Sequence, residues 1–423
     1  MALRQKAFKV QLDPTSSQKV QIDRTIGCAR FVYNRFLARR KEVYSSESEQ
    51  ATLNYNACSA ELTVLKKEIE WLSEVDKFAL QGALKDLDTA YQNFFRDCKK
   101  PAKQRHFKAP LFKKKHGSKQ SYRTNLTNGN IQVVENQLKL PKLKWVKFHK
   151  SQEIQGRILN VTVSRSSTGK YFASILCEVN ILPLPVSNEV VGVDLGLKDF
   201  FTSSDGEVVA NPRPYRTLER KLKRAGRNLS RKQPGSNNRR KAKTKLAKVH
   251  AQIANTREDF LHKTSTALIR ENGLICLETL RPKAMVKNRR LAKSISDASW
   301  GRFVGMLEYK ALWYGRTIVK IDPFFPSSQL CSTCGTKNSA TKDLSVREWT
   351  CIKCETEHHR DLNAAFNIRA EGLRIAVWPG RCRLDQDVAH GMGDTLNACG
   401  DGVNPESLLA TVAEAGIMGF LTP

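Results

Sequence analysis

Residues 189–200 read EVVGVDLGLKDF, and this stretch decides the fold of the second half of the chain. The apolar, β-branched run before Asp194 predicts a buried central strand with the acid at its end. Gly192 and Gly196 leave room for the close approach of another segment. A carboxylate in such a place is costly unless it binds a cation or a hydrogen-bond donor. An Asp at a strand end can also cap the following turn, so this motif alone leaves both interpretations open.

The same pattern returns in residues 273–280, GLICLETL, where a short apolar run again ends in an acid, Glu278. A helix is expected over about residues 256–271, and Gly273 marks its stop. Strand, helix and strand in this order are typical of a mixed sheet in the α/β class. Two acids are therefore expected at strand ends.

Residues 358–372, HHRDLNAAFNIRAEG, predict an amphipathic helix with a third acid, Asp361, at its start. A first-turn or capping role is the simple interpretation of this acid taken alone. Together with Asp194 and Glu278 it can converge on one point, where three carboxylates repel each other unless divalent cations bind among them. Oxygen ligands of this kind select Mg²⁺ or Mn²⁺. Two such ions, about 3.5–4 Å apart, would activate a water and stabilise the leaving oxygen of a phosphodiester.

Two cysteine pairs form the strongest single motif. Cys331 and Cys334 are followed, after 16 residues, by Cys351 and Cys354. This spacing predicts a tetrahedral four-thiolate Zn²⁺ site, which is structural because four sulfurs fill the coordination sphere. His358 and the following histidine are expected at the surface rather than as ligands. The other cysteines are expected to be small buried residues in a reducing cytosol: Cys28, Cys58, Cys98, Cys177, Cys276, Cys382 and Cys399.

The charge of the chain indicates a polyanionic partner. The 423 residues carry a formal net charge of +30, with 71 Lys and Arg against 41 Asp and Glu. Nucleic acid is favoured over a membrane, because no apolar run reaches about 18 residues and the N-terminus lacks a signal peptide. A cytoplasmic protein is expected. Residues 371–423 hold three basic and seven acidic residues, so we expect a disordered tail and a net charge of +34 on the preceding 370 residues.

The first half of the chain combines strand and helix patterns. Residues 1–12 and 122–179 alternate as strands and predict a small β-barrel closed by the N-terminal strand. Residues 16–95 are helical, with Ser73 expected to cap the helix that follows it. Residues 99–119 form a basic loop in which Phe107 and Phe112 suit base stacking, although a solvated loop is an equal alternative.

Residues 213–250 are the most basic stretch, with 15 basic residues and one acid. Pro234-Gly235-Ser236 divides it into two helices, which predicts a helical hairpin. Charge of one sign at this density is typical of a surface that follows a nucleic-acid backbone. The candidate nucleic-acid contacts in this hairpin are Arg220, Lys221, Arg224, Arg239, Arg240 and Lys241.

With GVDLGLKDF, CLETL, SDASWGRFVGMLEYKALWYGR, CSTCG, WTCIKC and HRDLNAAFNI in this order, the chain resembles the TnpB family. These are transposon-encoded, RNA-guided DNA endonucleases related to compact type V CRISPR effectors. The likeness extends over roughly residues 1–370. It implies that Asp194, Glu278 and Asp361 are catalytic, and that Lys77 and Phe78 contact a short motif beside the target. It also implies a guide RNA from the transposon end, double-stranded target DNA, and a monomer that works at the prokaryotic nucleoid.

The resemblance implies an α/β multidomain chain with an RNase H-like (RuvC) nuclease core. The expected parts are a wedge β-barrel (1–14 and 120–185), a helical recognition domain (15–119), the RuvC nuclease domain (186–326 and 359–370), a zinc-ribbon target-nucleic-acid-binding insert (327–358) and the tail (371–423). Two departures from the family pattern stand out. Glu355 replaces a glycine that often follows the second cysteine pair, and His359 stands where an acid commonly precedes Arg360-Asp361. Neither removes a ligand.

Three alternatives to a guided endonuclease remain. An unguided RuvC-like resolvase or transposase would use the same acids. An RNA-guided transcriptional regulator would be expected to have lost them, whereas all three are present. A zinc-ribbon RNA-binding protein would use the acids only as helix and turn caps.

Overall fold

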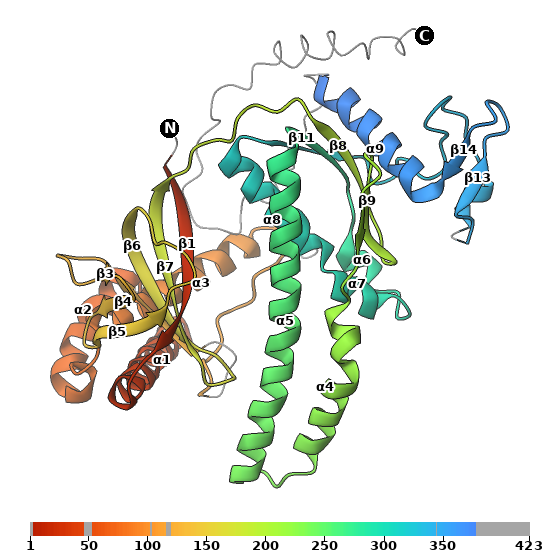
Figure 1. Cartoon of the computed structure of the whole chain (residues 1–423). Helices are drawn as coiled ribbons and strands as arrows, with labels where there is room; N and C mark the ends of the chain where they lie inside the picture. Colours follow the sequence, from red (N-terminus) through yellow and green to blue (C-terminus); the bar gives the residue numbers. More distant parts are fainter. Residues whose placement is uncertain (1–2, 46–52, 102–103, 116–119, 344, 378–423) are drawn as a thin grey trace. The chain divides into compact units, whose positions relative to one another are not determined.

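The computed structural model describes residues 3–45, 53–101, 104–115, 120–343 and 345–377 (Figure 1). The chain divides into two compact units. The first comprises Met1–Ile181 with Gln233–Ala247, and the second comprises Leu182–Lys232 with Lys248–Pro423. Within the described residues, every helix is too short or too polar to cross a membrane.

The first unit contains a seven-stranded antiparallel sheet in the order β2-β6-β7-β1-β5-β4-β3, together with three helices that share its core. The elements are β1 (Leu3–Asp13), α1 (Ser16–Ser45), α2 (Tyr55–Glu68), the 3₁₀ turn η1 (Glu70–Leu72), α3 (Lys77–Cys98), β2 (Gln120–Asn125), β3 (Gln132–Val134), β4 (Gln137–Leu140), β5 (Lys144–His149), β6 (Arg157–Arg165) and β7 (Tyr171–Asn180). The N-terminal strand β1 lies inside this sheet, between β7 and β5.

Local signals account for two features of this unit. β6 and β7 form the predicted hairpin, with Arg165 opposite Tyr171 and Gly169 at φ 86° in the turn. The start of α3 differs from the expectation. Asp76, not Ser73, is its N-cap, because the Asp76 carboxylate accepts the Phe78 backbone N–H at 3.0 Å.

The second unit contains a five-stranded mixed sheet in the order β10-β9-β8-β11-β12 (Figure 1). β8, β11 and β12 are parallel, whereas β9 pairs antiparallel with β8 and β10 pairs antiparallel with β9. The strands are β8 (Val190–Leu195), β9 (Asp199–Ser203), β10 (Val208–Ala210), β11 (Leu274–Glu278) and β12 (Thr317–Ile321). The helices are α4 (Pro214–Ser230), α5 (Asn237–Glu271, which begins in the first unit), α6 (Pro282–Met285), α7 (Ala292–Ala298), α8 (Trp300–Tyr314) and α9 (Arg360–Val377). This arrangement confirms the predicted mixed α/β class.

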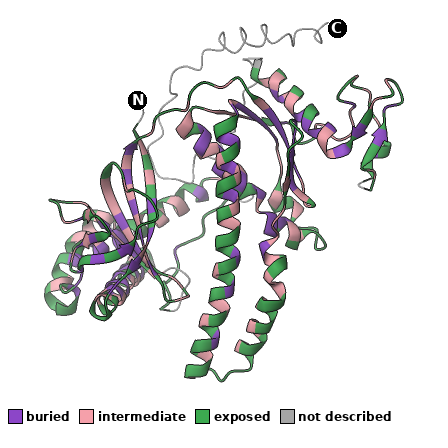
Figure 2. Ribbon diagram, viewed as in Figure 1, coloured by how far each residue is buried: buried purple, intermediate pink, exposed green. Residues whose placement is uncertain are grey.

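The first four residues of strand β11, before Glu278, are apolar and buried because both faces of the sheet are covered (Figure 2). Successive side chains point to opposite faces of a strand. Ile275 and Leu277 belong to a core shared with α5 and α8, whereas Cys276 packs in a second core with Ile368 of α9. Alternating apolar and polar residues would indicate a strand with one exposed face. The continuous apolar run instead predicted that both faces of β11 are buried, and this prediction is confirmed.

The basic stretch forms α4 and the first part of α5, separated by a turn at residues 231–236 in which Gly235 has φ 83°. The predicted break is confirmed. The Lys221 ammonium lies 3.5 Å from the Gln252 side-chain oxygen, so the two helices run beside each other there. The helix expected over residues 256–271 is only the end of α5, which is continuous from Asn237.

The end of the chain departs from the expected boundary. Helix α9 continues through Val377, so residues 371–377 are helical rather than the beginning of a tail. Residues 378–423, which hold the rest of the expected tail with Cys382 and Cys399, lie outside the described residues. Of the other scattered cysteines, Cys98 is exposed and the remaining four are buried as expected: Cys28, Cys58, Cys177 and Cys276.

Candidate functional site

Asp194 and Glu278 lie at equivalent places on two adjacent parallel strands. Val193 of β8 pairs with Leu277 of β11, and each acid is the next residue on its strand. Parallel strands end at the same edge of a sheet, and this edge is where α/β proteins commonly bind ligands. The first two predicted acids are therefore brought to one edge by strand register alone.

Helix α9 brings Asp361 to the same place by packing closely on β8. A Cβ atom at Gly192 would lie 2.1 Å from the Ala365 carbonyl oxygen, so only glycine allows this approach. Asp361 precedes Ala365 by four residues, about one helical turn. Because Gly192 precedes Asp194 by two residues, the close contact of helix and strand sets the first turn of α9 near the end of β8.

The electrostatics show that the other two carboxylates act on Asp194. The pKa of Asp194 is raised well above its usual value, first by burial and then by the charges of Glu278 and Asp361. Arg360 and Arg347 oppose this rise in pKa. Burial also raises the pKa of Glu278, and a hydrogen bond from Ser327 opposes it. A half-buried acid whose pKa is raised by two neighbouring carboxylates lies in a site in which added cations would be stabilising.

The three acids are arranged less tightly than the cysteine pairs. Among the described residues, the four cysteines are the only group in which three or more potential ligand atoms all lie within 4.8 Å of one another. Within the same part of the chain, the Asp194 carboxylate accepts no hydrogen bond, so the structure does not support the turn-cap interpretation of this acid.

Sequence reasoning missed two residues that contact the acids. Ser327 donates its hydroxyl to the Glu278 carboxylate at 2.8 Å. Arg347, located just before strand β13 (Glu348–Thr350), donates Nη1 to both carboxylate oxygens of Asp361 at 3.1 Å. Neither Ser327 nor Arg347 belongs to the same sequence motif as the acid that it contacts. The one feature of the sequence that hinted at these contacts was the presence of an arginine between the cysteine pairs.

Two asparagines on α9 fasten the segment that carries Ser327. Asn363 Nδ2 donates to the Leu330 carbonyl at 2.7 Å, while its Oδ1 accepts the Ser332 N–H at 2.9 Å. Asn367 Nδ2 donates to the carbonyls of Ser327 and Leu330, each at 2.7 Å. Their spacing of four residues puts both on one face of the helix. This spacing was a readable signal for a polar contact.

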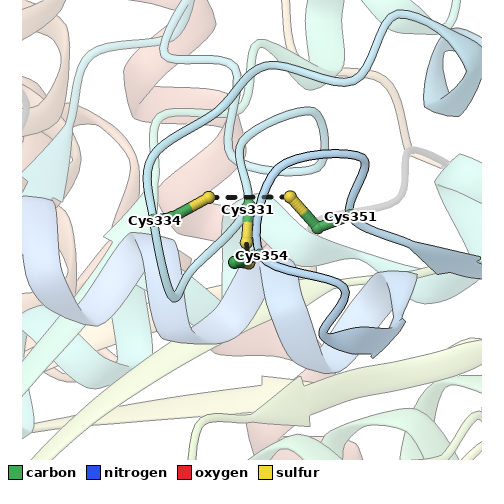
Figure 3. A group of neighbouring side chains, drawn as sticks. All are labelled: Cys331, Cys334, Cys351 and Cys354. Atoms are coloured by element: carbon green, nitrogen blue, oxygen red, sulfur yellow. Dashed lines mark hydrogen bonds between the residues drawn. The ribbon is translucent and has the colours of Figure 1, made fainter.

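The four predicted cysteines come together as the spacing required (Figure 3). The Cys331 and Cys354 sulfurs lie 3.5 Å apart, as do those of Cys334 and Cys351. The donor set fits a thiophilic ion such as zinc. Hydrogen bonds with Thr336 and Thr356 lower the thiol pKa of Cys334 and Cys354, to about 6 for Cys334. Burial instead raises the pKa of Cys331 to about 11.

The two cysteine pairs form matching turns. Gly335 donates its backbone N–H to the Cys331 carbonyl at 2.9 Å, and Glu355 does the same to Cys351. Gly335 has φ 74° and Glu355 has φ 54°, so both occupy the left-handed region that favours glycine. This conformation favours a glycine at the position that follows each pair. In this chain a non-glycine residue adopts the conformation at residue 355.

The surface placement expected for His358 is wrong. His358 belongs to strand β14 (Glu357–His359), and its ring is buried against Trp349. The centroids of the His358 and Trp349 rings lie 4.6 Å apart. Its Nε2 lies 3.0 Å from the Cys331 sulfur. His359 is exposed, as expected. Strand alternation sends consecutive residues to opposite faces, so the second of two neighbouring histidines can be surface-exposed while the first touches the cysteines.

The predicted nucleic-acid contacts are mostly exposed. In the first unit, Lys77 is exposed at the start of α3, with its ammonium 5.1 Å from the half-buried Phe78 ring. Phe107 and Phe112 are also substantially exposed. The hairpin candidates are exposed except for the half-buried Arg239: Arg220, Lys221, Arg224, Arg240 and Lys241. Residues 220–224 belong to the second unit and residues 239–241 to the first.

Three family models match the chain. The OrfB_IS605 model, described as "Probable transposase", matches residues 174–289. The model "Cas12f1-like, TNB domain" matches residues 300–368, and a "Helix-turn-helix domain" model of the same OrfB_IS605 group matches residues 1–49. The second match spans the cysteine pairs and Asp361, and the first spans Asp194 and Glu278.

Relatives and one solved structure cover most of the chain. A "Putative RNA-guided DNA endonuclease" of Streptomyces pristinaespiralis is 40% identical over 405 residues, which are 95% of this chain and 92% of the relative. The "Putative RNA-guided DNA endonuclease InsQ" of Escherichia coli K12 is 34% identical, covering 88% and 93%. The chain from a Cas12f1–sgRNA–target DNA complex is similar in fold, with 15% identity, a TM-score of 0.51, and coverage of 87% and 99%. With relatives this similar over nearly their whole length, the chain belongs to the TnpB family.

Proposed function

We propose that this protein is an RNA-guided DNA endonuclease that cuts double-stranded DNA next to a short target-adjacent motif. One observation carries the proposal. Asp194, Glu278 and Asp361 meet at one sheet edge, in a chain 40% identical to a relative named for this activity. A protein that only bound nucleic acid would gain nothing from mutually repelling acids at such an edge.

The sheet order supports an RNase H-like (RuvC) nuclease core formed by residues 186–326 and 359–370. In this assignment residues 327–358 are a zinc-ribbon insert that binds the target nucleic acid. Residues 1–14 with 120–185 are the wedge domain, and residues 15–119 are the recognition domain. The proposal is supported by the family match that covers the cysteine pairs and by the continuous antiparallel sheet that joins β1 to β2–β7.

We assign Mg²⁺ or Mn²⁺ to the three acids and one structural Zn²⁺ to the four cysteines. Hard carboxylate oxygens suit the former ions, and four thiolates suit the latter. The divalent ions would supply an activated water and charge stabilisation for phosphodiester hydrolysis. The chain's own residues prepare this site. Ser327 orients the Glu278 carboxylate, and Arg347 holds a positive charge beside Asp361, where a phosphate could also be bound.

The partners of the proposed enzyme are a guide RNA from the transposon end and double-stranded target DNA, bound by a monomer. The +34 charge of residues 1–370 suits an RNA and an RNA–DNA duplex held by their backbones. Base pairing would then supply sequence specificity, and the protein would read only the adjacent motif. Lys77 and Phe78 are the proposed contacts to that motif.

Co-purification tests the proposal directly. The protein is expressed with its flanking transposon DNA, the bound nucleic acid is sequenced, and Mg²⁺ and a matched plasmid library are added. We expect one discrete RNA and guide-dependent cutting beside a fixed motif. Cutting that ignores the guide would instead indicate an unguided RuvC-like nuclease or transposase. A discrete RNA without cutting would indicate a transcriptional regulator.

The Asp194→Ala variant separates chemistry from binding in the same assay. It should abolish cutting while guide-dependent DNA binding stays within about twofold of wild type, because the acid acts only on the reacting phosphate. Loss of both would give Asp194 a role in folding. Cys331→Ser should lower bound zinc and cutting together, and full activity without zinc would contradict a structural metal.

A further inference from the structure

A basic pocket of about 590 Å³ lies beside the start of α4 in the second unit. Three segments line it: the turn that follows β8, the residues around the start of α4, and the loop that leads from α6 into α7 together with α7 itself. Its six cationic side chains are Lys198, Arg213, Arg216, Arg289, Arg290 and Lys293, whereas only two acidic side chains line it.

Both acids are already engaged. Asp297 is buried and accepts the backbone N–H groups of Tyr215 and Arg216 at 3.0–3.2 Å, and the Arg257 guanidinium donates to it at 2.9 Å. Glu219 binds the ammonium groups of Lys223 and Lys293 at 3.0 and 2.9 Å, and these lower its pKa to about 2. Neither acid therefore remains to balance the other cations of the pocket.

Four cations are left over. Arg213 is engaged, because its Nη2 donates to the carbonyls of Leu197 and Lys198 at 3.1 and 2.8 Å. Across the part of the chain that the structure describes, no hydrogen bond or ion pair engages the side chains of the remaining four, which are Lys198, Arg216, Arg289 and Arg290. All four are exposed. Like charges gathered in one hollow repel each other, so an anionic ligand with several charges would stabilise this arrangement.

The pocket lies close in sequence to Asp194, because one of its lining segments directly follows the strand that carries this acid. Lys198 follows Asp194 by four residues, so the two Cα atoms are at most about 14 Å apart. Two side chains hold the turn after β8 against the start of α4. Arg213 donates to the carbonyl of Leu197, and Asn211 Nδ2 donates to the same carbonyl at 3.1 Å. A strand advances about 3.4 Å per nucleotide in a duplex, so this distance corresponds to about four nucleotides.

We infer that this pocket binds the phosphodiester backbone of the DNA strand being cut, a few nucleotides from the cleaved bond. Arginine forks match the paired oxygens of a phosphate, and three of the four unengaged cations are arginines. The inference rests on the proposed function, because it assumes that the bound strand is DNA and that it is cut at the three acids. It adds a binding site, distinct from those acids, that positions the substrate.

The Arg289→Ala/Arg290→Ala double variant tests the inference. Equilibrium binding of labelled single-stranded oligothymidylate is measured in EDTA across a range of salt concentrations. Loss of two phosphate contacts should weaken binding by about tenfold and reduce the slope of log affinity against log salt by about 1.4. Arg289→Lys/Arg290→Lys should restore most of the slope because it restores the charge. Both arginines are exposed, and an unchanged melting temperature would verify that the Ala variant folds.

Lys263→Ala/Arg270→Ala is the matched control. It also removes two positive charges, but from exposed positions on α5 that do not line the pocket. Binding by the pocket variant that equals wild type or the control would overturn the inference. Reduced retention of guide RNA with unchanged oligothymidylate binding would assign the pocket to RNA instead, which also overturns it. Because the assay uses neither guide nor cleavage, a wild-type protein that failed to cut would refute the proposed function and leave this binding result standing.

Discussion

Arg347 donates Nη1 to both carboxylate oxygens of Asp361 at 3.1 Å, and its backbone carbonyl accepts the N–H of Arg360 at 2.7 Å. The residue lies between the two cysteine pairs, so the cysteine-bearing segment touches the first turn of α9. Its side chain binds the same carboxylate that is proposed to bind a divalent ion. An ion bound there would therefore compete with the arginine for Asp361.

Replacing Arg347 should reveal that competition. Since the pair is partly exposed, its loss corresponds to about 0.2–1 kcal/mol, and Arg347→Ala should bind Mn²⁺ up to about fivefold more tightly. Calorimetric titration of the zinc-loaded protein with Mn²⁺ measures this. Arg347→Lys, which keeps the charge, should lie closer to wild type. Equal Mn²⁺ affinity in wild type and the Ala variant would show that the ion pair opposes metal binding by no measurable amount.

Gly192→Ala should separate α9 from β8. The new Cβ would meet the backbone of α9 at 2.1 Å, and backbone cannot move aside as a flexible side chain can. Overpacking of this kind costs about 1–3 kcal/mol or more, which lowers the melting temperature by several degrees. Gly226→Ala in α4 is the control, because nothing lies within 4 Å of its added Cβ. Thermal melts in which the two variants behaved alike would contradict the close contact.

Asp194→Asn should change how stability depends on pH in metal-free protein. The folded pKa of Asp194 is raised above the unfolded value of about 3.9, so the folded state binds more protons. Stability is therefore lost as pH rises from the unfolded pKa through the folded pKa. The neutral amide avoids this loss, so the variant should melt at a higher temperature than wild type at pH 8 in EDTA. Mg²⁺ should then stabilise wild type more than the variant.

Melting curves at pH 5 and pH 8 check this sign. The charged groups that act on Asp194 are Glu278, Asp361, Arg360 and Arg347, and they are the same in both proteins, so the informative quantity is the difference between variant and wild type. That difference should grow in favour of the variant as pH rises. A variant less stable than wild type at pH 8 in EDTA would contradict the repulsion among the acids.

The sequence predicted those parts of the site that depend on one short segment. Two apolar runs ending in Asp194 and Glu278 predicted two buried strands, and the spacing of the cysteines predicted their convergence. Both signals are local, because strand burial and a four-residue metal turn are properties of consecutive residues. The mixed sheet followed from the order of strands and helices.

Contacts between distant segments were not predictable in this way. Ser327 meets Glu278 only because α9 holds its segment, and Arg347 meets Asp361 across 13 intervening residues. The sequence predicted a helix after Pro234-Gly235-Ser236 and another over about residues 256–271, but not that the two form one continuous helix α5. Its first turns are rich in Lys and Arg, so the apolar spacing that marked the later part was absent there. Long charged side chains are nevertheless good helix formers.

His358→Ala should weaken the hold of the cysteine site on its metal. His358 Nε2 lies 3.0 Å from the Cys331 sulfur, so an N–H from this ring can share the negative charge of the thiolate. Loss of such a supporting contact commonly lowers metal affinity by about 10–100-fold. Zinc transfer to a chromogenic chelator, followed at equilibrium, measures the change directly and does not depend on nuclease activity.

His359→Ala provides the matched control for this experiment, since the two histidines are adjacent and only His358 is buried. The control should release zinc as wild type does. His358→Phe keeps the ring against Trp349 but removes the donor, so it separates packing from hydrogen bonding. If His358→Phe retained wild-type zinc affinity while His358→Ala lost it, the ring would act by packing, and the hydrogen bond to Cys331 would contribute nothing measurable.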